Sequence, residues 1–479
     1  MTDTEAAANR GSEKIGKDEI LGLVAMCVAI FIVANDFTAL SVAIPAIEKD
    51  FGVDLTTVQW VINGYALVFG VLIVTGGRLA DMFGQRLIFF IGAAVFGFFS
   101  LIGGLAPNIG MLLAARFCMG IGGALMWPAV LGMTYRILPK SKAGLAGGII
   151  LGAAGFGNAV GPLIGGTLTD LASWRWIFLL NLPIALLGIF VTWRFIPKAA
   201  TSTEEHRVDY GGIAVLSIAL LALLLALDQG ADLGWLNPRI LGFFVVAAVL
   251  LAAFGFVEQR VGNSALVPPD VMRNRAFIAA AGGTLMMASL IFATFLYLPQ
   301  YMMKHLGFSA IGAGAGLLPL MGMFAATSFV SGPFYNRVGP KIAVTTGAVA
   351  LTAGIFMLTV ISNAPSYGGI VPGMVVLGIG IGLFYSSITT AGITAVDDSR
   401  SSLASAIIYM AQIAGGSIGL GLNTAIVATA PSLTQGISRA FFVDGCLAVV
   451  GLLIVLFSVG GKVDKERIES LIHRHRAHG

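Results

Sequence analysis

The sequence predicts an all-α membrane protein. Hydrophobic residues make up 57% of the 479 residues and charged residues only 11%, whereas soluble domains carry about 25% charged residues. The mean hydropathy is +0.91. Many apolar runs exceed about 18 residues, the length that spans a bilayer as a helix. Because so few charges cannot cover a water-facing surface, we expect the chain to lie within a lipid bilayer.

Fourteen apolar runs separated by short polar segments predict fourteen transmembrane helices. The first run is about 25 residues long, whereas signal-peptide cores have about 7–15 residues, so we expect a retained helix. The expected spans are 20–45, 57–77, 87–106, 109–134, 143–168, 175–196, 210–229, 238–257, 276–300, 311–332, 342–361, 367–391, 403–429 and 438–460.

Basic residues predict the orientation of these helices, because cytoplasmic loops carry an excess of Lys and Arg. With the N-terminus in the cytoplasm, the outer loops hold only Lys49, Arg175, Arg239, Lys304 and Arg439. An even number of spans then places both termini in the cytoplasm. We therefore expect a multi-pass integral protein of the cell membrane, either inner or plasma membrane.

Several classes of function are not expected from the sequence. The cysteines Cys27, Cys118 and Cys446 all lie in apolar runs, which argues against disulfides. No His/Cys cluster has metal-ligand spacing, and no P-loop is present. We predict no enzyme, no metal and no cofactor. The basic tail at 461–479 is expected to contact anionic lipid; nucleic-acid binding is the weaker alternative, and we predict no nucleic-acid partner.

One polar pattern occurs twice, each time at the inner end of a span. The two copies are Gly77-x3-Asp81-x2-Gly84-x-Arg86 and Gly332-x3-Asn336-x2-Gly339-x-Lys341. Glycines allow tight turns, and a carboxylate suits a neighbouring helix N-terminus. A generic short loop with cytoplasmic charge is the plain alternative.

The repeat divides the chain into two like halves. We expect a six-helix bundle over 20–200, two inserted helices over 201–262 and a second six-helix bundle over 263–460. The cytoplasmic tails are then 1–19 and 461–479.

Four motifs stand out in the first half of the chain. They are Asn35-Asp36-Phe37-Thr38 ending at Ala43-Ile44-Pro45, Gly77 to Arg86, Arg116-Phe117-x2-Gly120-x-Gly122-Gly123-Ala124, and Gly157 to Gly166 followed by Trp174 to Phe178 and Asn181-x-Pro183. They resemble motifs of the major facilitator superfamily, specifically its fourteen-span drug:proton antiporter branch (EmrB/QacA-like proteins). In the second motif Met82 stands where the family usually has a basic residue, which implies a weaker conformational latch.

The resemblance implies export by alternating access, with one set of residues that moves or gates the bundles. These residues are Gly77, Asp81, Gly84, Arg86, Gly157, Gly161, Pro162, Gly165 and Gly166. Small residues also recur at every fourth position, at Gly144, Gly148 and Gly152 and again at Gly157, Gly161 and Gly165. We expect one flat ridge that rocks; tight packing is the plain interpretation.

Asp36 and Arg116 are the expected proton-coupling residues. Asp36 lies inside the first span, where a carboxylate costs about 2.5–3.5 kcal/mol and is expected to face the bundle interior. Arg116, in the motif that the family associates with proton transfer, needs acceptors and could tune Asp36 by its charge. A structural role, with hydrogen bonds to backbone, is the alternative for each residue.

The substrate is expected to meet Asp36 together with aromatic residues inside the spans, namely Tyr65, Trp127, Tyr297 and Tyr409. Most aromatic residues of a membrane protein face lipid or neighbouring helices instead. The tenth span, 311–332, contains no acidic residue, and Asp444 is expected near the outer end of the last span, where it could reach water. A single carboxylate neutralises one positive charge, so we predict neutral or monocationic substrates.

The sequence therefore predicts a secondary active transporter that exports small lipophilic compounds in exchange for protons. Its partners are the lipophilic substrate, protons and the bilayer, and no adaptor protein is identified. The alternatives are a dedicated exporter of one metabolite or antibiotic of the host and, as a weaker possibility, a non-transporting membrane sensor.

Overall fold

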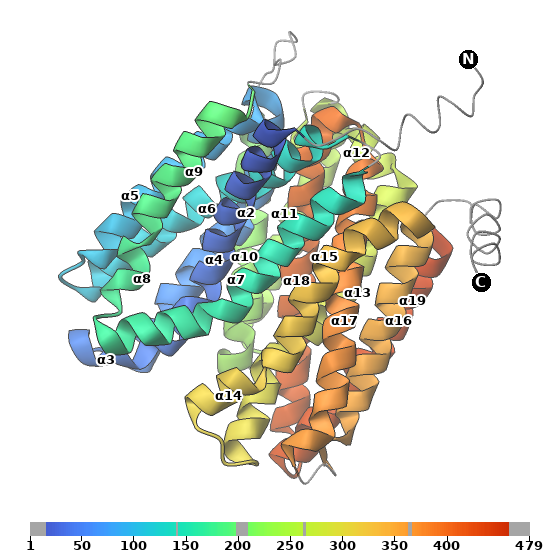
Figure 1. The fold of residues 1–479 in the computed structure, drawn as a ribbon. Helices are drawn as coiled ribbons and strands as arrows, with labels where there is room; N and C mark the ends of the chain where they lie inside the picture. The colour runs from blue at the N-terminus through green and yellow to red at the C-terminus, as the bar shows by residue number, and fades with distance from the viewer. Residues whose placement is uncertain (1–15, 140–141, 198–208, 262–264, 363–365, 459–479) are drawn as a thin grey trace.

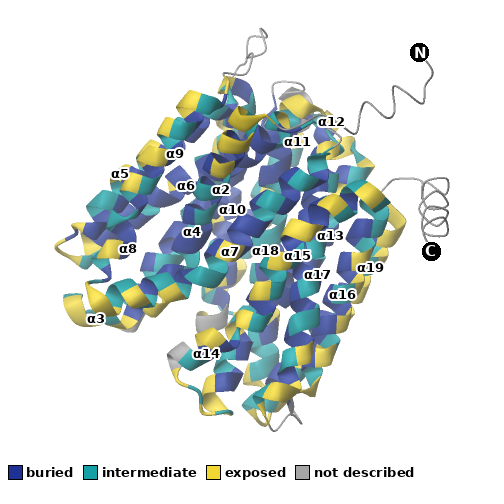
Figure 2. Cartoon of the chain, in the orientation of Figure 1, coloured by how far each residue is buried: buried dark blue, intermediate teal, exposed yellow. Residues whose placement is uncertain are grey.

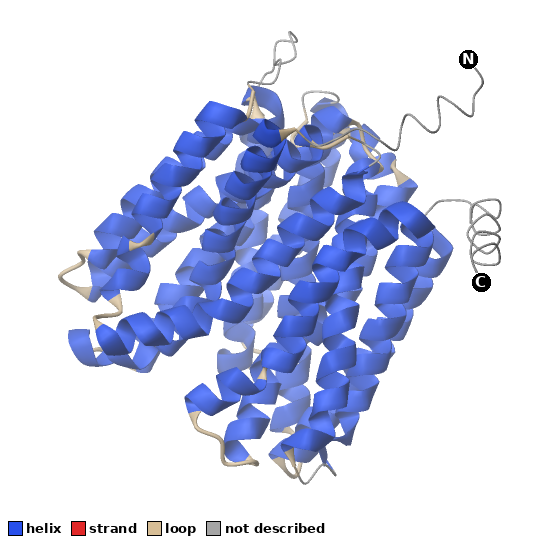
Figure 3. Ribbon diagram, viewed as in Figure 1, coloured by secondary structure: helices blue, strands red, loops and turns tan. Residues whose placement is uncertain are grey.

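The computed structural model describes residues 16–139, 142–197, 209–261, 265–362 and 366–458. Within these ranges the chain is helical and contains no strand (Figure 3). The expected tails and the boundaries near 200 and 262 fall largely outside the described residues. The all-α prediction is confirmed.

Thirteen helices of the described ranges are long and apolar enough to cross a membrane. The sixth of these spans joins the short α8 to α9. In chain order the membrane helices are α2 (Lys17–Ala39), α4 (Leu55–Phe83), α5 (Gln85–Gly104), α6 (Ile109–Ile137), α7 (Ala143–Leu171), α8 (Arg175–Leu179), α9 (Asn181–Phe195), α10 (Tyr210–Leu233), α11 (Pro238–Val261), α13 (Arg275–Lys304), α16 (Pro340–Leu358), α17 (Tyr367–Thr394), α18 (Ser401–Ala428) and α19 (Leu433–Ser458).

The remaining expected span, 311–332, is interrupted. It consists of α14 (Ala310–Gly316) and α15 (Leu318–Val338), which meet at Leu317. Pro319 lies at the second position of α15 and lacks the N–H that would continue the hydrogen bonding of α14. Helix α15 packs against α7 and α17, so this segment is part of the same helix assembly (Figure 1).

The helices form two bundles that lie side by side (Figure 1). One buried apolar cluster draws mainly on α2 to α9 and a second on α13 to α19. Buried residues concentrate inside the assembly, and exposed residues cover the outer helices and the helix ends (Figure 2). Helix α2 begins and α19 ends on the same side of the molecule, which we call the terminus side; the other is the far side.

The two additional helices pack at the junction of the bundles. Helix α10 contacts α4 of the first bundle and α18 of the second, and α11 packs against α10. Only 11% of the most apolar part of α11 is buried. Because its exposed surface is apolar, α11 presents a face suited to lipid.

The shorter elements lie at the ends of the membrane helices. They are α3 (Ile44–Phe51), α12 (Pro269–Arg273), and the 3-10 turns η1 (Leu40–Val42), η4 (Thr359–Ser362) and η5 (Asp398–Arg400).

Candidate functional site

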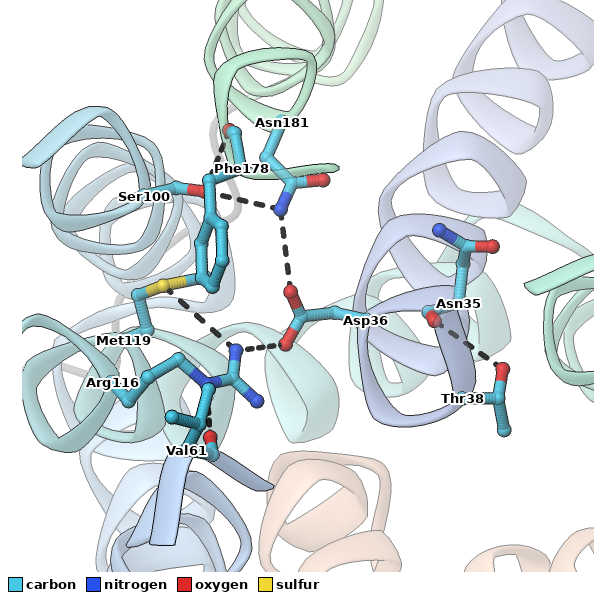
Figure 4. Close-up of polar contacts among 9 residues, drawn as sticks. All are labelled: Asn35, Asp36, Thr38, Val61, Ser100, Arg116, Met119, Phe178 and Asn181. Atoms are coloured by element: carbon cyan, nitrogen blue, oxygen red, sulfur yellow. Dashed lines mark hydrogen bonds and ion pairs between the residues drawn. The ribbon is translucent and has the colours of Figure 1, made fainter. Parts of the chain in front are cut away.

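Asp36 and Arg116 form an ion pair in the interior of the first bundle (Figure 4). Arg116 Nη1 of α6 donates to Asp36 Oδ2 of α2 at 2.5 Å, and both side chains are 0% exposed. A charge moved out of water costs several kcal/mol, which only close pairing and further hydrogen bonds offset. Each residue therefore depends on the other to remain charged at this depth.

The Asn181 amide contacts the Asp36 carboxylate and is in turn bonded to the Ser100 hydroxyl. Asn181 Nδ2, at the start of α9, lies 3.3 Å from Asp36 Oδ1 and 3.1 Å from Ser100 Oγ of α5. The Ser100 hydroxyl donates to the Phe178 carbonyl at 2.8 Å. This chain of hydrogen bonds fixes the Asn181 amide so that its N–H faces the carboxylate (Figure 4).

Helix α4 supplies the remaining contacts of the guanidinium. Arg116 Nε donates to the Val61 carbonyl at 2.5 Å, and the guanidinium carbon lies 4.3 Å from the centroid of the Tyr65 ring. Such a cation–π contact is worth about 2 kcal/mol when desolvated. Among the described residues, Arg116 Nη2 and Tyr65 Oη are buried without a hydrogen-bond partner. Within the described ranges, Arg116 and Tyr65 thus each keep one hydrogen-bond donor without a partner.

The Asp36–Arg116 ion pair is the centre of a cluster that joins several helices. Helices α2, α4, α5, α6 and α9 all contribute a group to the cluster. Any change at this ion pair therefore acts on contacts among five helices of one bundle.

A small cavity lies between the two bundles. Its volume is about 80 Å³, below the roughly 300–1,000 Å³ of ligand pockets. Among the described residues its lining carries no charged side chain, and most of it is apolar or aromatic. The lining residues are Trp127, Leu131, Leu151, Ala154, Asn158, Ile291, Phe295, Phe324, Ile381, Tyr385, Thr389, Ser405, Ile408, Tyr409 and Gln412.

Aromatic rings connect this cavity to the ion pair. Tyr65, which covers Arg116, lies 5.9 Å from Phe69 between ring centroids. Phe69 lies 5.7 Å from Tyr409 and 6.2 Å from Trp127, and these two rings, 4.3 Å apart, join α18 to α6. The contacts form a continuous packed path from the charged pair to the junction of the bundles.

The predicted substrate residues do not all lie in one place. Trp127 and Tyr409 line the central cavity, but Asp36 and Tyr65 lie behind it, in the interior of the first bundle. Tyr297 is also absent from the lining and donates to Thr424 at 2.9 Å. In this conformation Asp36, Tyr65 and Tyr297 do not line the cavity, because each side chain contacts partners within its own bundle, and their contact with substrate stays a prediction.

The repeated polar motif joins the two bundles on the terminus side. Asp81 of α4 accepts from the backbone N–H groups of Ser402 and Leu403, at 3.1 and 2.8 Å, at the start of α18. In the second copy, Asn336 of α15 accepts from Gly144 N at 3.2 Å, at the start of α7. Both residues satisfy free donors at a helix N-terminus, but only Asp81 adds the favourable negative charge.

The glycines of the motif have two separate uses. Gly77 and Gly332 lie where α4 meets α18 and α15 meets α7, and a Cβ there would come within 2.7 Å of the Ser402 carbonyl and 2.6 Å of the Gly144 carbonyl. Gly84 and Gly339 form the following turns at φ of 97° and 84°, which glycine adopts readily.

Arg86, at the end of the first copy, acts within the first bundle. Its guanidinium donates to the carbonyls of Ile196 and Trp193, at 2.7 and 2.8 Å, at the end of α9. A cation suits these free carbonyls at a helix C-terminus. Arg86 therefore holds the turn between α4 and α5 against α9.

The six spaced glycines of α7 do not form one surface between the bundles. A Cβ on Gly144, Gly148 or Gly152 would meet Gly332, Ser328 or Phe329 of α15, in the second bundle. Gly157, Gly161 and Gly165 instead turn to Phe31, Thr38 and Ala39 of the first span, so the six glycines form two ridges, and their part in the rocking motion stays a prediction. Pro162 lies inside α7 beside this change of partner, and Gly166 has open space.

A second, exposed pair lies on the far side. Arg175 Nη1 donates to Asp50 Oδ2 at 2.5 Å, and Trp174 Nε1 donates to the same oxygen at 3.2 Å. The hydrogen bond from Arg175 holds the pKa of the Asp50 carboxyl below its ordinary value. The pair ties α3 to the start of α8.

Sequence reasoning missed Ser100 and placed Asp444 incorrectly. Ser100 is a common residue in an apolar run, and no pattern there indicates a partner. Asp444 was expected near water, but α19 begins at Leu433, so this residue lies about three turns inside the helix and is 0% exposed. No group of three or more His, Cys, Asp or Glu side chains suited to a metal occurs in the described ranges.

The ion pair predicts a specific pattern of stability changes. Asp36→Asn and Arg116→Gln each leave one buried charge unpaired, which costs about 3–5 kcal/mol. We expect each single variant to lower the unfolding temperature of the purified protein, and the double variant to lower it by less than the two changes together. Thermal unfolding in detergent measures all three.

The exposed pair provides the control. Asp50→Asn and Arg175→Gln, separately and together, are expected to change the unfolding temperature little, since solvent screens this pair. If the Asp36 and Arg116 variants unfolded at the temperature of the unaltered protein, the two charges would not depend on each other.

Comparison with known proteins agrees with the architecture. The Major Facilitator Superfamily profile matches residues 26–420. The human organic anion transporter MFSD10 has a similar fold, with a TM-score of 0.66 and 12% identity over 91% of this chain and 99% of that chain. The proton:xylose symporter XylE gives a TM-score of 0.64 and 15% identity, over 93% of this chain and 97% of that one. At these identities the likeness concerns the fold alone.

Related sequences include antibiotic-resistance proteins of Streptomyces. The puromycin resistance protein pur8 of Streptomyces alboniger is 33% identical over 92% of this chain and 88% of that protein. The lincomycin resistance protein of Streptomyces lincolnensis is 32% identical over 95% and 94%, and the tetracenomycin C resistance and export protein of Streptomyces glaucescens is 30% identical over 85% and 76%. The chain therefore belongs to the major facilitator superfamily and is a multi-pass membrane transporter.

Proposed function

We propose that this transporter exports small lipophilic compounds, neutral or with one positive charge, in exchange for protons. The observation that carries the proposal is the buried Asp36–Arg116 pair, which packed aromatic rings connect to an uncharged cavity between the bundles. The protein resides in the cell membrane, and its terminus side faces the cytoplasm, as the excess of basic residues there favours.

In the proposed cycle, Asp36 takes up a proton from the outside and releases it to the cytoplasm. Protonation separates Asp36 from Arg116 and leaves the guanidinium with the Val61 carbonyl and the Tyr65 ring. The driving force is about 2.3 kcal/mol per charge for each 100 mV, and about 1.4 kcal/mol for each pH unit. These amounts are sufficient to concentrate a solute outside the cell.

The central cavity supports the proposed class of substrate. Trp127, Phe295 and Tyr409 offer apolar and aromatic surface, while Asn158 and Gln412 offer hydrogen bonds to a neutral polar group. Aromatic faces also attract a single cation. A cavity of about 80 Å³ cannot hold a drug-sized molecule, so substrate entry requires the bundles to move apart.

The contacts on the terminus side support alternating access. Asp81, Asn336 and the close approach of Gly77 and Gly332 hold α4 against α18 and α15 against α7. We propose that these contacts form the cytoplasmic gate and that they separate when the cavity opens inward. Gly157, Gly161 and Gly165 pack closely against the first span and are proposed to position α2, the helix that bears Asp36, whereas Pro162 and Gly166 are proposed to act in the movement of α7 itself.

A dedicated antibiotic exporter is the second candidate function. The relatives named for resistance to puromycin and lincomycin, and for resistance to and export of tetracenomycin C, favour it. Both candidates use the same proton site and differ only in how many compounds the cavity accepts.

Energy coupling can be tested by efflux from whole cells. In cells of a pump-deficient host that express the protein, we expect efflux of a lipophilic dye to stop when a protonophore collapses the proton gradient. Asp36→Asn is expected to abolish uphill efflux, because its amide cannot exchange a proton. Asp50→Asn, which changes an exposed carboxylate, is the matched control and is expected to retain efflux. Efflux that continued in the Asp36→Asn variant would place the coupling elsewhere.

The preference for substrates with at most one positive charge can be tested with matched cations. For mono- and bis-quaternary ammonium compounds of matched hydrophobicity, we expect the bis-cation to be exported at least about 10-fold more slowly. A factor of ten corresponds to about 1.4 kcal/mol, and an uncompensated charge in the cavity costs more than this. Equal export of the two compounds would show that cavity charge does not determine selectivity.

A further inference from the structure

A second fully buried carboxyl group lies in the other bundle. Asp444 of α19 is 0% exposed. Its Oδ1 is hydrogen-bonded to the Ser289 hydroxyl of α13, and its Oδ2 accepts from Asn423 Nδ2 of α18 at 2.9 Å. All its hydrogen-bond partners in the described ranges are neutral, which distinguishes this site from the Asp36–Arg116 pair.

The helices around Asp444 bring no buried cation. Helix α19 packs against α13, α16, α18 and η4. Their ionisable residues are Arg275, Lys304 and Lys341 at helix ends, the tyrosines Tyr297, Tyr301 and Tyr409, and Arg439 and Cys446 of α19, both exposed. Of these, Tyr297 donates its hydroxyl hydrogen to Thr424. Helix α17 is the fourth membrane-crossing segment of the second half, as α6, which carries Arg116, is of the first half. Helix α17 contains no Lys or Arg.

Charge and hydrogen bonding both favour a bound proton at this position. An ionised carboxylate without a cation is costly in an apolar interior, whereas a protonated one is neutral. A serine hydroxyl rotates, so Ser289 can donate to a carboxylate or accept from a protonated carboxyl. Asn423 Oδ1 is a buried acceptor with no partner among the described residues. The site therefore fits both protonation states without movement of the backbone.

A polar path leads from this site toward a groove. Tyr297 donates to Thr424, the residue that follows Asn423 on α18. Thr424 lines a groove of about 480 Å³ between α4, α10, α13 and α18, together with the polar residues Gln59, Asn63 and Asp228. Water in this groove would bring protons close to the buried carboxyl.

We propose that Asp444, Ser289 and Asn423 form a second proton-binding site, in the second bundle and independent of Asp36. Proton binding there can be observed without substrate and without transport. The inference therefore does not depend on the proposed export function.

Infrared spectroscopy of the purified protein in lipid vesicles tests this site directly, because a protonated carboxyl has its own carbonyl-stretch band. At neutral pH and without substrate, we expect such a band in protein labelled with 13C-aspartate, shifted by the isotope. Asp444→Asn is expected to remove it. Ser289→Ala, which leaves the carboxyl in place, is expected to shift its frequency through loss of one hydrogen bond.

Two further variants establish which carboxyl gives the band. Asp36→Asn and the exposed Asp50→Asn are both expected to retain it. An unchanged band in a correctly folded Asp444→Asn variant, or loss of the band in Asp36→Asn, would overturn the proposal. Loss of the wild-type band on adding sodium at constant pH would also overturn it, since it would show a metal-cation site in place of a proton site.

Discussion

The structure of the first bundle depends on keeping one arginine charged in an apolar interior. Arg116 is 0% exposed and reaches neither water nor lipid headgroups. Its charge is stabilised by the Asp36 carboxylate, the Val61 carbonyl and the Tyr65 ring, which come from α2 and α4. Asn181 of α9 donates to the carboxylate and also to the hydroxyl of Ser100 of α5. The requirement to pair this one charge therefore brings together groups from five helices, and this is why we propose Asp36 as the residue that couples helix packing to proton entry.

The two halves of the chain share a helical arrangement but differ in the charge of the polar residues that they place at equivalent depths. On the terminus side, Asp81 and Asn336 occupy equivalent positions and satisfy the N-termini of α18 and α7, one with a charge and the other without. In the interior, the first half pairs Asp36 with a cation, whereas the second half surrounds Asp444 with neutral groups. Two similar helix bundles thus hold one charged polar cluster, around Asp36 and Arg116, and one cluster in which Asp444 has only neutral partners among the described residues. The central cavity lies between the bundles.

The sequence predicts which residues lie inside the membrane more reliably than it predicts which way each side chain points around its helix. Apolar length and the position of charges placed nearly all spans, and the buried carboxylate of Asp36 and cation of Arg116 were recognisable because charges are rare there. Lipid-facing and buried faces are both apolar, so periodicity did not show that Gly157, Gly161 and Gly165 turn to the first span, or that Tyr65 and Tyr297 turn away from the cavity. Asp444 was misplaced because α19 begins earlier than its apolar run.

We propose that protonation of Asp36 changes the placement of the bundles. This proposal can be tested by electron paramagnetic resonance distances between spin labels on the far side, at Leu171→Cys of α7 and Ser432→Cys beside α19, with Cys27, Cys118 and Cys446 replaced. We predict that acidification shifts the distance distribution in this background and that adding Asp36→Asn removes most of the shift. An equal shift in the Asp36→Asn protein would contradict the account.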